Sequence, residues 1–429
     1  MNLILAIPLP VRLVVLFVFG TLAGALVNWA VYRLAWNRRS ISPWSAPAAN
    51  APKRRAIDRV PLVGWLSLRR ESALQGRGFW VRPMMVELVA GLTLAALYVW
   101  EVENAARLWA FVGAAPPPPE FLTANLALAD HLRYLGHVVL VSLMLAASLI
   151  DLDEKTIPDS ITVPGTLVAL ALAALYPWSL PAAAHFVIAA QPQVEFLTLA
   201  SPNAWPPGLD ALPMLTGLTV ALACWTLWCG GLLPRHWNTG RGWALAARVF
   251  FHRLRVERLT YAIVVMWFIG AAAIALVAWQ AGIARWAALV TALVGIAAGG
   301  GIVWAVRVIG GSVLGREAMG FGDVTLLSLI GAFLGWQACL MIFFVAPFFG
   351  LAFAIVNWVL HREREVPYGP FLCLGAVVVM LKWPAFWAQT ADLFGLPWLV
   401  PAVIACGLAL LGVLLWIYRI IEQLFVRSC

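Results

Sequence analysis

The sequence predicts an all-α polytopic membrane protein. Of its residues, 63% are hydrophobic and only 11% are charged, and its mean hydropathy is +0.88. Apolar runs of about 18 to 25 residues recur along the chain, and this is the length that an α-helix needs to cross a bilayer. The Lys and Arg residues behind the net charge of +9 gather in a few loops. They therefore indicate membrane topology rather than a nucleic-acid partner.

The apolar runs predict about eleven membrane-spanning helices. They cover approximately residues 11–34, 84–100, 132–150, 160–176, 213–233, 259–281, 287–309, 323–334, 338–360, a stretch that opens at 366–372, and 399–421.

Charge orients these helices. The loop 36–83 is rich in Lys and Arg, and its only acidic residues are Asp58 and Glu71. The positive-inside rule places such a loop in the cytoplasm. The N-terminus is then expected outside and the C-terminus inside.

Several polar or small residues interrupt the first two predicted helices. Gly20 and Gly24 have the spacing of closely packed membrane helices. Asn28 is expected to link helices rather than to bind a ligand, and Arg33 ends its helix. Glu87 falls in the first turn of the second predicted helix, where it either complements the helix dipole or lines a polar cavity.

Two carboxylates are predicted to meet at the cytoplasmic ends of helices. The alternation of spans places Asp151 and Asp323 on the same side, and Gly320 and Gly322 before Asp323 permit a sharp turn or a close approach. Two neighbouring carboxylates can share one proton and so provide an acid and a base that activate water. The alternative is two unrelated carboxylates, one of which caps a helix. Asp159 is expected to be the N-cap of the helix that follows it.

No other catalytic or metal-binding pattern competes with this pair. The six cysteines form no CxxC pair, so a structural zinc site and a disulfide framework are not expected. The sequence has no HExxH, no GxSxG and no Walker-type loop.

Five stretches, in order, resemble the type IV prepilin peptidases, a family of GxGD aspartyl membrane proteases. The first is Gly24–Leu34, and the second combines Val60–Arg69 with Val81–Leu88. The third joins Leu149-Ile-Asp151 to Ile157-Pro-Asp159. The others are Glu317–Leu327, continued by Ile330–Gln337, and Val366-Pro-Tyr-Gly-Pro-Phe-Leu372.

The resemblance implies that Asp151 and Asp323 are the catalytic pair. It implies removal of the basic leader of type IV prepilins or of secretion-system pseudopilins, at the cytoplasmic face of the bacterial inner membrane. Many members also methylate the new N-terminus with S-adenosylmethionine. The residues that the matching motifs contribute around the pair are Gly320, Gly322, Glu87, Asn28, Arg33, Asp159, Pro367 and Gly369.

The chain departs from the family in three places. Residues 36–83 lack the cysteine pairs that many members carry, so no zinc is expected, and S-adenosylmethionine would be needed only if methyl transfer is retained. Thr325 stands where the family usually has Lys. The segment between the two aspartates is longer than in compact members and is expected to be an insertion with two extra helices.

The resulting organisation has five parts. They are the first helix (1–35), the cytoplasmic loop (36–83), the helices with the first aspartate (84–176), the inserted segment (177–281), and the helices with the GxGD motif (282–429). The alternative functions are a catalytically altered relative that acts in pilus or secretion assembly, a transporter, and a presenilin-like intramembrane protease.

Overall fold

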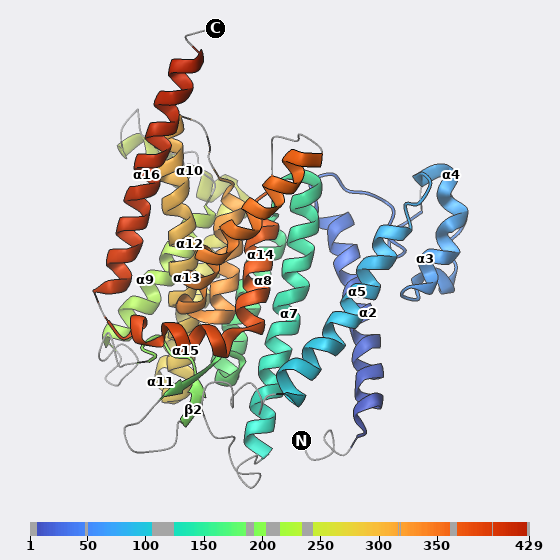
Figure 1. Cartoon of the computed structure of the whole chain (residues 1–429), viewed down its shortest axis with the longest axis horizontal. Coiled ribbons are helices and arrows are strands. Elements are labelled where there is room, and N and C mark those ends of the chain that lie inside the picture. Colours follow the sequence, from blue (N-terminus) through green and yellow to red (C-terminus); the bar gives the residue numbers. More distant parts are fainter. Residues whose placement is uncertain are drawn as a thin grey trace.

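The computed structural model describes residues 7–47, 50–104, 124–185, 193–202, 215–233, 243–315, 317, 319–360, 367–396 and 398–426. These residues form a bundle of long helices that run roughly side by side (Figure 1). The elements of the N-terminal half are α2 (Leu9–Leu34), η1 (Ala56–Arg59), α3 (Val63–Ser67), η2 (Leu68–Glu71), α4 (Ser72–Gln75), α5 (Val81–Tyr98), the π-helical turn η3 (Val99–Glu103), α7 (Ala124–Glu154), α8 (Asp159–Leu175) and η4 (Pro177–Ser179). The remaining elements are β1 (Ala182–His185), β2 (Gln193–Phe196), α9 (Leu215–Leu232), α10 (Trp243–Val256), α11 (Arg258–Gln280), α12 (Ile283–Leu314), α13 (Phe321–Leu360), α14 (Gly369–Leu381), α15 (Trp383–Phe394) and α16 (Leu399–Val426).

The all-α membrane class is confirmed. In the part of the chain that the structure describes, 8 helices are long and apolar enough to cross a membrane, or 9 if α14 and α15, which meet at 90°, form one broken span. The apolar helix α8 has only 17 residues. The predicted number of about eleven spans is therefore not confirmed by helix length and stays a prediction.

The predicted break near Gly335 is confirmed. Gly335 has φ 81° and ψ 171°, which interrupts α13 with a backbone conformation that glycine adopts without steric cost. The thiol of Cys339 lies 3.8 Å from the carbonyl oxygen of Leu327. In a continuous helix these residues would be about 18 Å apart along the axis. α13 therefore folds back at Gly335 into two arms, as the sequence predicts.

The close packing predicted for the first helix is also confirmed. A Cβ atom at Gly20 would lie 2.7 Å from Cα of Gly91, and one at Gly24 would lie 2.6 Å from Cα of Glu87. α2 and α5 thus approach each other through glycine.

Two helix starts differ from the sequence prediction. α5 begins at Val81, because Pro83 fits within the first turn of a helix. Glu87 is therefore not in the first turn, and its predicted dipole role is wrong. α8 has Pro158 in extended conformation as its N-cap, so Asp159 is the first helical residue and the predicted cap is wrong by one position.

The segment 177–281 contains a feature that the sequence did not predict. β1 and β2 form an antiparallel two-stranded sheet with Ala182 opposite Phe196. It lies at the end of the bundle where α2 begins, opposite the end that carries α3 and α4 (Figure 1).

Candidate active site

Asp151 and Asp323 lie at the same end of the bundle, as predicted. Asp151 belongs to the last turn of α7 and is 5% exposed, whereas Asp323 belongs to the first turn of α13 and is 8% exposed. The carboxylate of Asp323 lies within the electrostatic reach of Asp151. Two carboxylates in this relation can hold one proton between them.

Ile157 lies between the starts of α13 and α14. A Cβ atom at Gly322 would lie 2.8 Å from Cβ of Ile157, and one at Gly369 would lie 2.8 Å from its Cδ1. The same atom at Gly369 would lie 2.6 Å from Oδ2 of Asp151. The starts of α13 and α14 can therefore press against Ile157 and the end of α7 only because both positions are glycine.

Backbone groups are the donors to the two aspartates. The N–H of Gly369 donates to Oδ2 of Asp151 at 3.1 Å, and a backbone hydrogen bond from Gly320 reaches Asp323. Gly320, Gly322 and Gly369 are thus brought to the aspartates, as the motifs implied. Pro367 is partly buried just before α14.

Tyr368 is a neighbour that sequence reasoning missed. Burial, together with the charge of Asp323, raises the pKa of Tyr368 to about 12. Its phenol therefore stays protonated at neutral pH and can donate a hydrogen bond near the aspartates. Its place beside Gly369 in the predicted motif was the available signal.

The cation expected two residues after Asp323 comes from elsewhere. Thr325 is 4% exposed, and its hydroxyl donates to the carbonyl of Gly322 at 3.1 Å. Arg307 of α12 instead acts on Asp323 electrostatically. Its guanidinium lies 5.7 Å from the ring centre of Phe321 and donates to Glu317 at 2.7 Å. Because Arg307 belongs to another helix, local sequence carried no signal for it.

Asn28 and Glu87 bind the start of α5 and the loop 36–83 rather than the aspartates. Asn28 Nδ2 donates to the carbonyl of Pro83 at 2.8 Å and to Oε1 of Glu87 at 3.2 Å, which confirms its predicted role between helices. Glu87 also accepts from the indole of Trp65 at 2.8 Å and from the N–H of Leu62 at 2.6 Å. Leu62 has φ 64°, a strained value for this residue, and the bond to Glu87 fixes it there.

Arg33 and Asp159 are not brought into the site. Arg33 is exposed at the end of α2, and Asp159 is exposed at the start of α8. Both motif residues therefore lie on the surface of the bundle.

The loop that lacks cysteines folds around ion pairs. Oδ2 of Asp58 accepts from Arg70 Nη2 at 2.5 Å and from the N–H of Arg55 at 2.6 Å, and Oδ1 accepts from Ser67 at 2.9 Å. The Arg70 guanidinium holds the pKa of Asp58 well below its usual range. Buried Glu71 pairs with Arg54 at 3.1 Å. Among the described residues, no group of three or more His, Cys, Asp or Glu could hold a metal ion.

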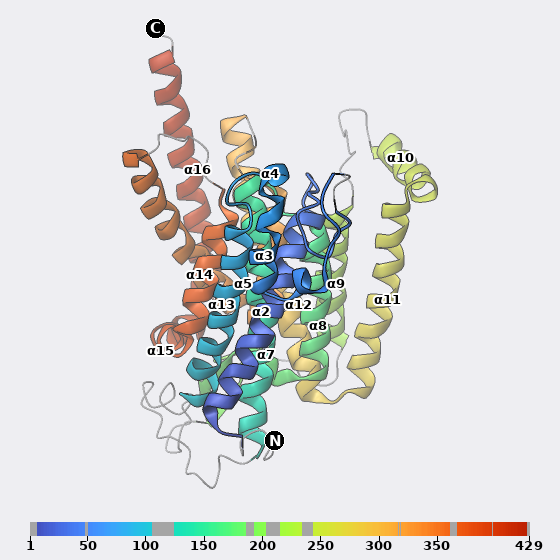
Figure 2. The same cartoon turned by 90° about the vertical axis from the view of Figure 1, so that its right-hand side faces the viewer.

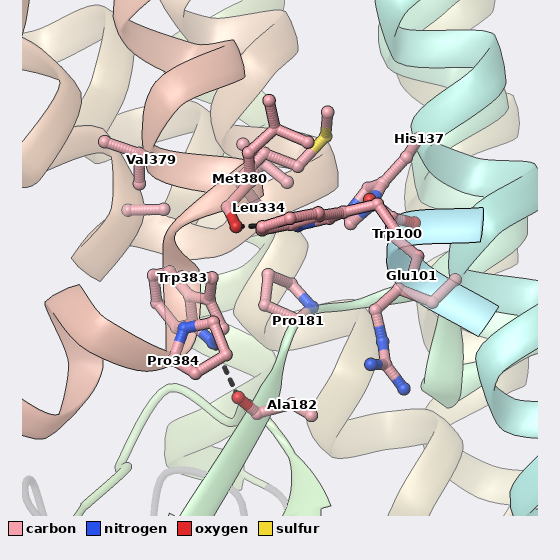
Figure 3. Close-up of a pocket in the computed structure, with 13 residues that line it drawn as sticks. Trp100, Glu101, His137, Pro181, Ala182, Leu334, Val379, Met380, Trp383 and Pro384 are labelled. Atoms are coloured by element: carbon pink, nitrogen blue, oxygen red, sulfur yellow. Dashed lines mark hydrogen bonds and ion pairs between the residues drawn. The ribbon is translucent and has the colours of Figure 1, made fainter. Parts of the chain in front are cut away.

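A separate pocket is lined in part by His137 of α7 (Figure 3). This cavity of about 40 Å³ is lined by Glu101 and His137, whose side chains are 2.7 Å apart, and by Trp100 and Trp383. His137 precedes Asp151 by 14 residues, or about 21 Å along the helix. The pocket is therefore not part of the aspartate site.

Comparison with known proteins matches two parts of the chain. Residues 18–101 match the model of the bacterial peptidase A24 N-terminal domain, and residues 250–355 match the model of the type IV leader peptidase family. The first region contains Asn28 and Glu87, and the second contains Asp323. Asp151 lies between the two matched regions, so its place in the site rests on the geometry given above.

Curated relatives match over short stretches. A protein of Escherichia coli (strain K12) named prepilin leader peptidase/N-methyltransferase is 35% identical over 99 residues, which cover 22% of this chain and 44% of the relative. A protein with the same name from Myxococcus xanthus (strain DK1622) is 29% identical over 38% of this chain and 41% of the relative. Another from Burkholderia pseudomallei (strain K96243) is 33% identical over 22% of this chain and 31% of the relative. The chain thus matches less than half the length of these relatives. No solved structure matches. In these regions the chain is therefore similar to the type IV leader peptidase family and to proteins named prepilin leader peptidase/N-methyltransferase.

Proposed function

We propose that this chain is an aspartic endopeptidase that removes the basic leader of type IV prepilins or pseudopilins at the cytoplasmic face of the bacterial inner membrane. The observation that carries the proposal is that Ile157 lies against both Gly322, which precedes Asp323, and Gly369, whose N–H donates to Asp151. The names of the matching relatives support the choice of substrate.

The chemistry follows from two buried carboxylates that share a proton. The ionised carboxylate accepts a proton from a water molecule, and the oxygen of that water attacks the scissile carbonyl carbon. The protonated carboxyl donates a hydrogen bond to that carbonyl and supports the developing oxyanion. When the intermediate collapses, the leaving amine takes a proton, which restores one shared proton in the pair. The products are a leader with a free carboxylate and a substrate with a new amino terminus.

The position of Asp151 favours cleavage at the membrane face. Asp151 lies three residues before the end of α7 at Glu154, and Asp323 lies in the first turn of α13. A protease that cuts within a bilayer needs its aspartates deeper in the helices. This placement supports a substrate whose scissile bond lies at the cytoplasmic boundary.

Methyl transfer lies outside the proposed activity. The relatives' name includes N-methyltransferase, but the loop 36–83 of this chain has no cysteine and folds around the Asp58–Arg70 and Glu71–Arg54 pairs. S-adenosylmethionine is therefore not proposed as a cofactor. Mass spectrometry of the cleaved product, with and without added S-adenosylmethionine, checks this: a gain of one methyl group would contradict it.

Replacement of each aspartate by Asn tests the peptidase directly. Asp151→Asn and Asp323→Asn should each lower the rate of leader removal by about 10³-fold or more, because neither variant can share a proton in the same way. Asp159→Asn is the matched control, since Asp159 is exposed on the next helix and should leave the rate unchanged. Normal cleavage of a prepilin by either Asp151→Asn or Asp323→Asn, in a folded protein, would remove the basis of the proposal.

A further inference from the structure

The helix α10 stands apart from the rest of the bundle. Within the described chain it packs mainly against α11, and Figure 2 shows it lying across the end of that helix. This end also carries α3, α4 and the aspartate site. An isolated helix in this place needs a partner for its surface.

The sequence of α10 has two faces. Ala247, Phe250 and Phe251 follow the i, i+3, i+4 spacing of one helix side, whereas Arg248, His252 and Arg255 follow i, i+4, i+7 on an adjacent side. A basic side next to an aromatic side is typical of helices that lie in the interface of a membrane.

Each face has exposed side chains. Phe251 is 61% exposed, and Val256 at the end of the helix is 67% exposed. Arg248 and Arg255 are also exposed. Arg253 is different, because it donates to Glu257 at 2.6 Å and so is partly neutralised within the chain. The charges left for an external partner are therefore those of Arg248 and Arg255.

The surroundings indicate which partner this is. α11 is apolar enough to cross a membrane, so the helix at its end lies at the depth of the lipid headgroups. Exposed aromatic rings need an apolar phase, and the adjacent arginines need anions. Anionic phospholipids offer both in one surface, whereas a soluble polyanion offers only charge.

We propose that α10 is a binding surface for anionic phospholipid headgroups, with Phe251 inserted below the headgroups and Arg248 and Arg255 at their level. The helix α9 packs against α11, and a Cβ atom at Gly231 of α9 would lie 3.9 Å from the ring of Phe321 at the start of α13. This inference goes beyond the proposed peptidase and does not depend on it.

Spin-label accessibility tests the placement of the helix. The protein, with Cys406 and Cys429 replaced by Ser, is labelled at Phe251→Cys or at Ala73→Cys and placed in bilayers that contain phosphatidylglycerol. Ala73 is exposed on α4 and serves as the aqueous reference. The label at 251 should be reached by oxygen in preference to a water-soluble nickel reagent, and the label at 73 should show the reverse. Equal access of the nickel reagent to both positions would overturn the proposal.

Lipid selectivity tests the headgroup. The fraction of spin-labelled lipid whose motion is restricted by contact with the protein is measured for phosphatidylglycerol and for phosphatidylcholine. The wild type is compared with Arg248→Gln, Arg255→Gln and Arg285→Gln. Each of the first two changes should lower the preference for phosphatidylglycerol by about fivefold, which corresponds to about 1 kcal/mol per arginine near the surface. Arg285 is exposed near the start of α12 at the other end of α11, so its replacement should have no such effect. Unchanged lipid selectivity in the α10 variants would contradict the assignment, and it is the result expected if a soluble polyanion is the partner. An equal loss of selectivity in Arg285→Gln would also contradict it.

Discussion

Two sets of buried carboxylates in this protein differ in what surrounds them. Asp58 in the loop 36–83 accepts hydrogen bonds from Arg70, Ser67 and the backbone of Arg55. Asp151, among the described residues, accepts one hydrogen bond, from the N–H of Gly369, and its charge acts on the carboxylate of Asp323.

This difference separates a structural carboxylate from one suited to chemistry. A carboxylate with a bidentate arginine stays ionised and fixes the chain around it. A carboxylate with few donors beside a second carboxylate can exchange a proton instead. Stability is therefore expected to depend on the first set and turnover on the second, and the following experiments are ways to break that separation.

Asp58→Asn should produce the largest loss of stability. It leaves Arg70 in the loop without its partner, and loss of one member of a buried pair costs about 3 kcal/mol. Thermal unfolding and limited proteolysis of the loop measure the effect. Asp153→Asn is the control, because the Asp153–Arg82 pair is more exposed and is worth about 0–1 kcal/mol. Equal losses in the two variants would contradict the assigned difference between the pairs.

Gly322→Ala should affect turnover rather than stability of the loop. Its Cβ atom would lie 2.8 Å from Cβ of Ile157, so α13 or Ile157 must shift near Asp323. A displacement of about 1 Å at a reacting group costs about 100-fold in rate. Gly301→Ala is the matched change, because no heavy atom lies within 4 Å of its Cβ position. The prediction fails if both variants cleave a prepilin at the same rate.

Lower pH should release the loop through Asp58. Its folded pKa is held below the unfolded value of about 3.9, so the stabilisation is fully present above that value and is lost as pH falls through the folded pKa. Pepsin cleavage within the loop should therefore increase below about pH 4 in the wild type. The rate of pepsin cleavage in Asp58→Asn, divided by the rate in the wild type, should fall toward one as pH decreases over the same range. A ratio independent of pH would show that Asp58 is not the group responsible.

Glu87→Gln should have the smallest effect of the series. It weakens bonds from Trp65 and Leu62 but keeps a side chain of the same shape, and a hydrogen bond to a charged group is worth about 1.5–3 kcal/mol. We expect a loss of about 1–2 kcal/mol in stability. The rate of cleavage by the folded variant should stay close to that of the wild type. A loss of rate as large as that of Gly322→Ala would place Glu87 in the chemistry instead.

Much of the site was accessible from sequence. Alternation of spans places Asp151 and Asp323 at one end of the bundle, and the glycines of the motifs predict close approach. These inferences succeed because membrane helices have nearly fixed length and orientation. The break at Gly335 was visible for the same reason, as a short apolar run that ends in glycine.

Tertiary neighbours were not accessible. Arg307 reaches the site from α12, and Ile157 looks like an ordinary apolar residue in the sequence. The predicted start of α5 was about one turn too late, so Glu87 was wrongly placed in the first turn. The predicted N-cap of α8 was Asp159 instead of Pro158, one residue too late. The pairing of Asp58 with Arg70, rather than with another of the many arginines of the loop, also depends on the folded loop.

The most direct test of the paired aspartates is the initial rate of prepilin leader removal by the double variant Asp151→Asn/Asp323→Asn, measured beside the two single variants at equal folded concentration. Two residues that act as one unit give non-additive losses. The pair predicts that the double variant is no slower than either single variant. Losses that multiply, so that each aspartate contributes independently, would contradict the shared-proton account.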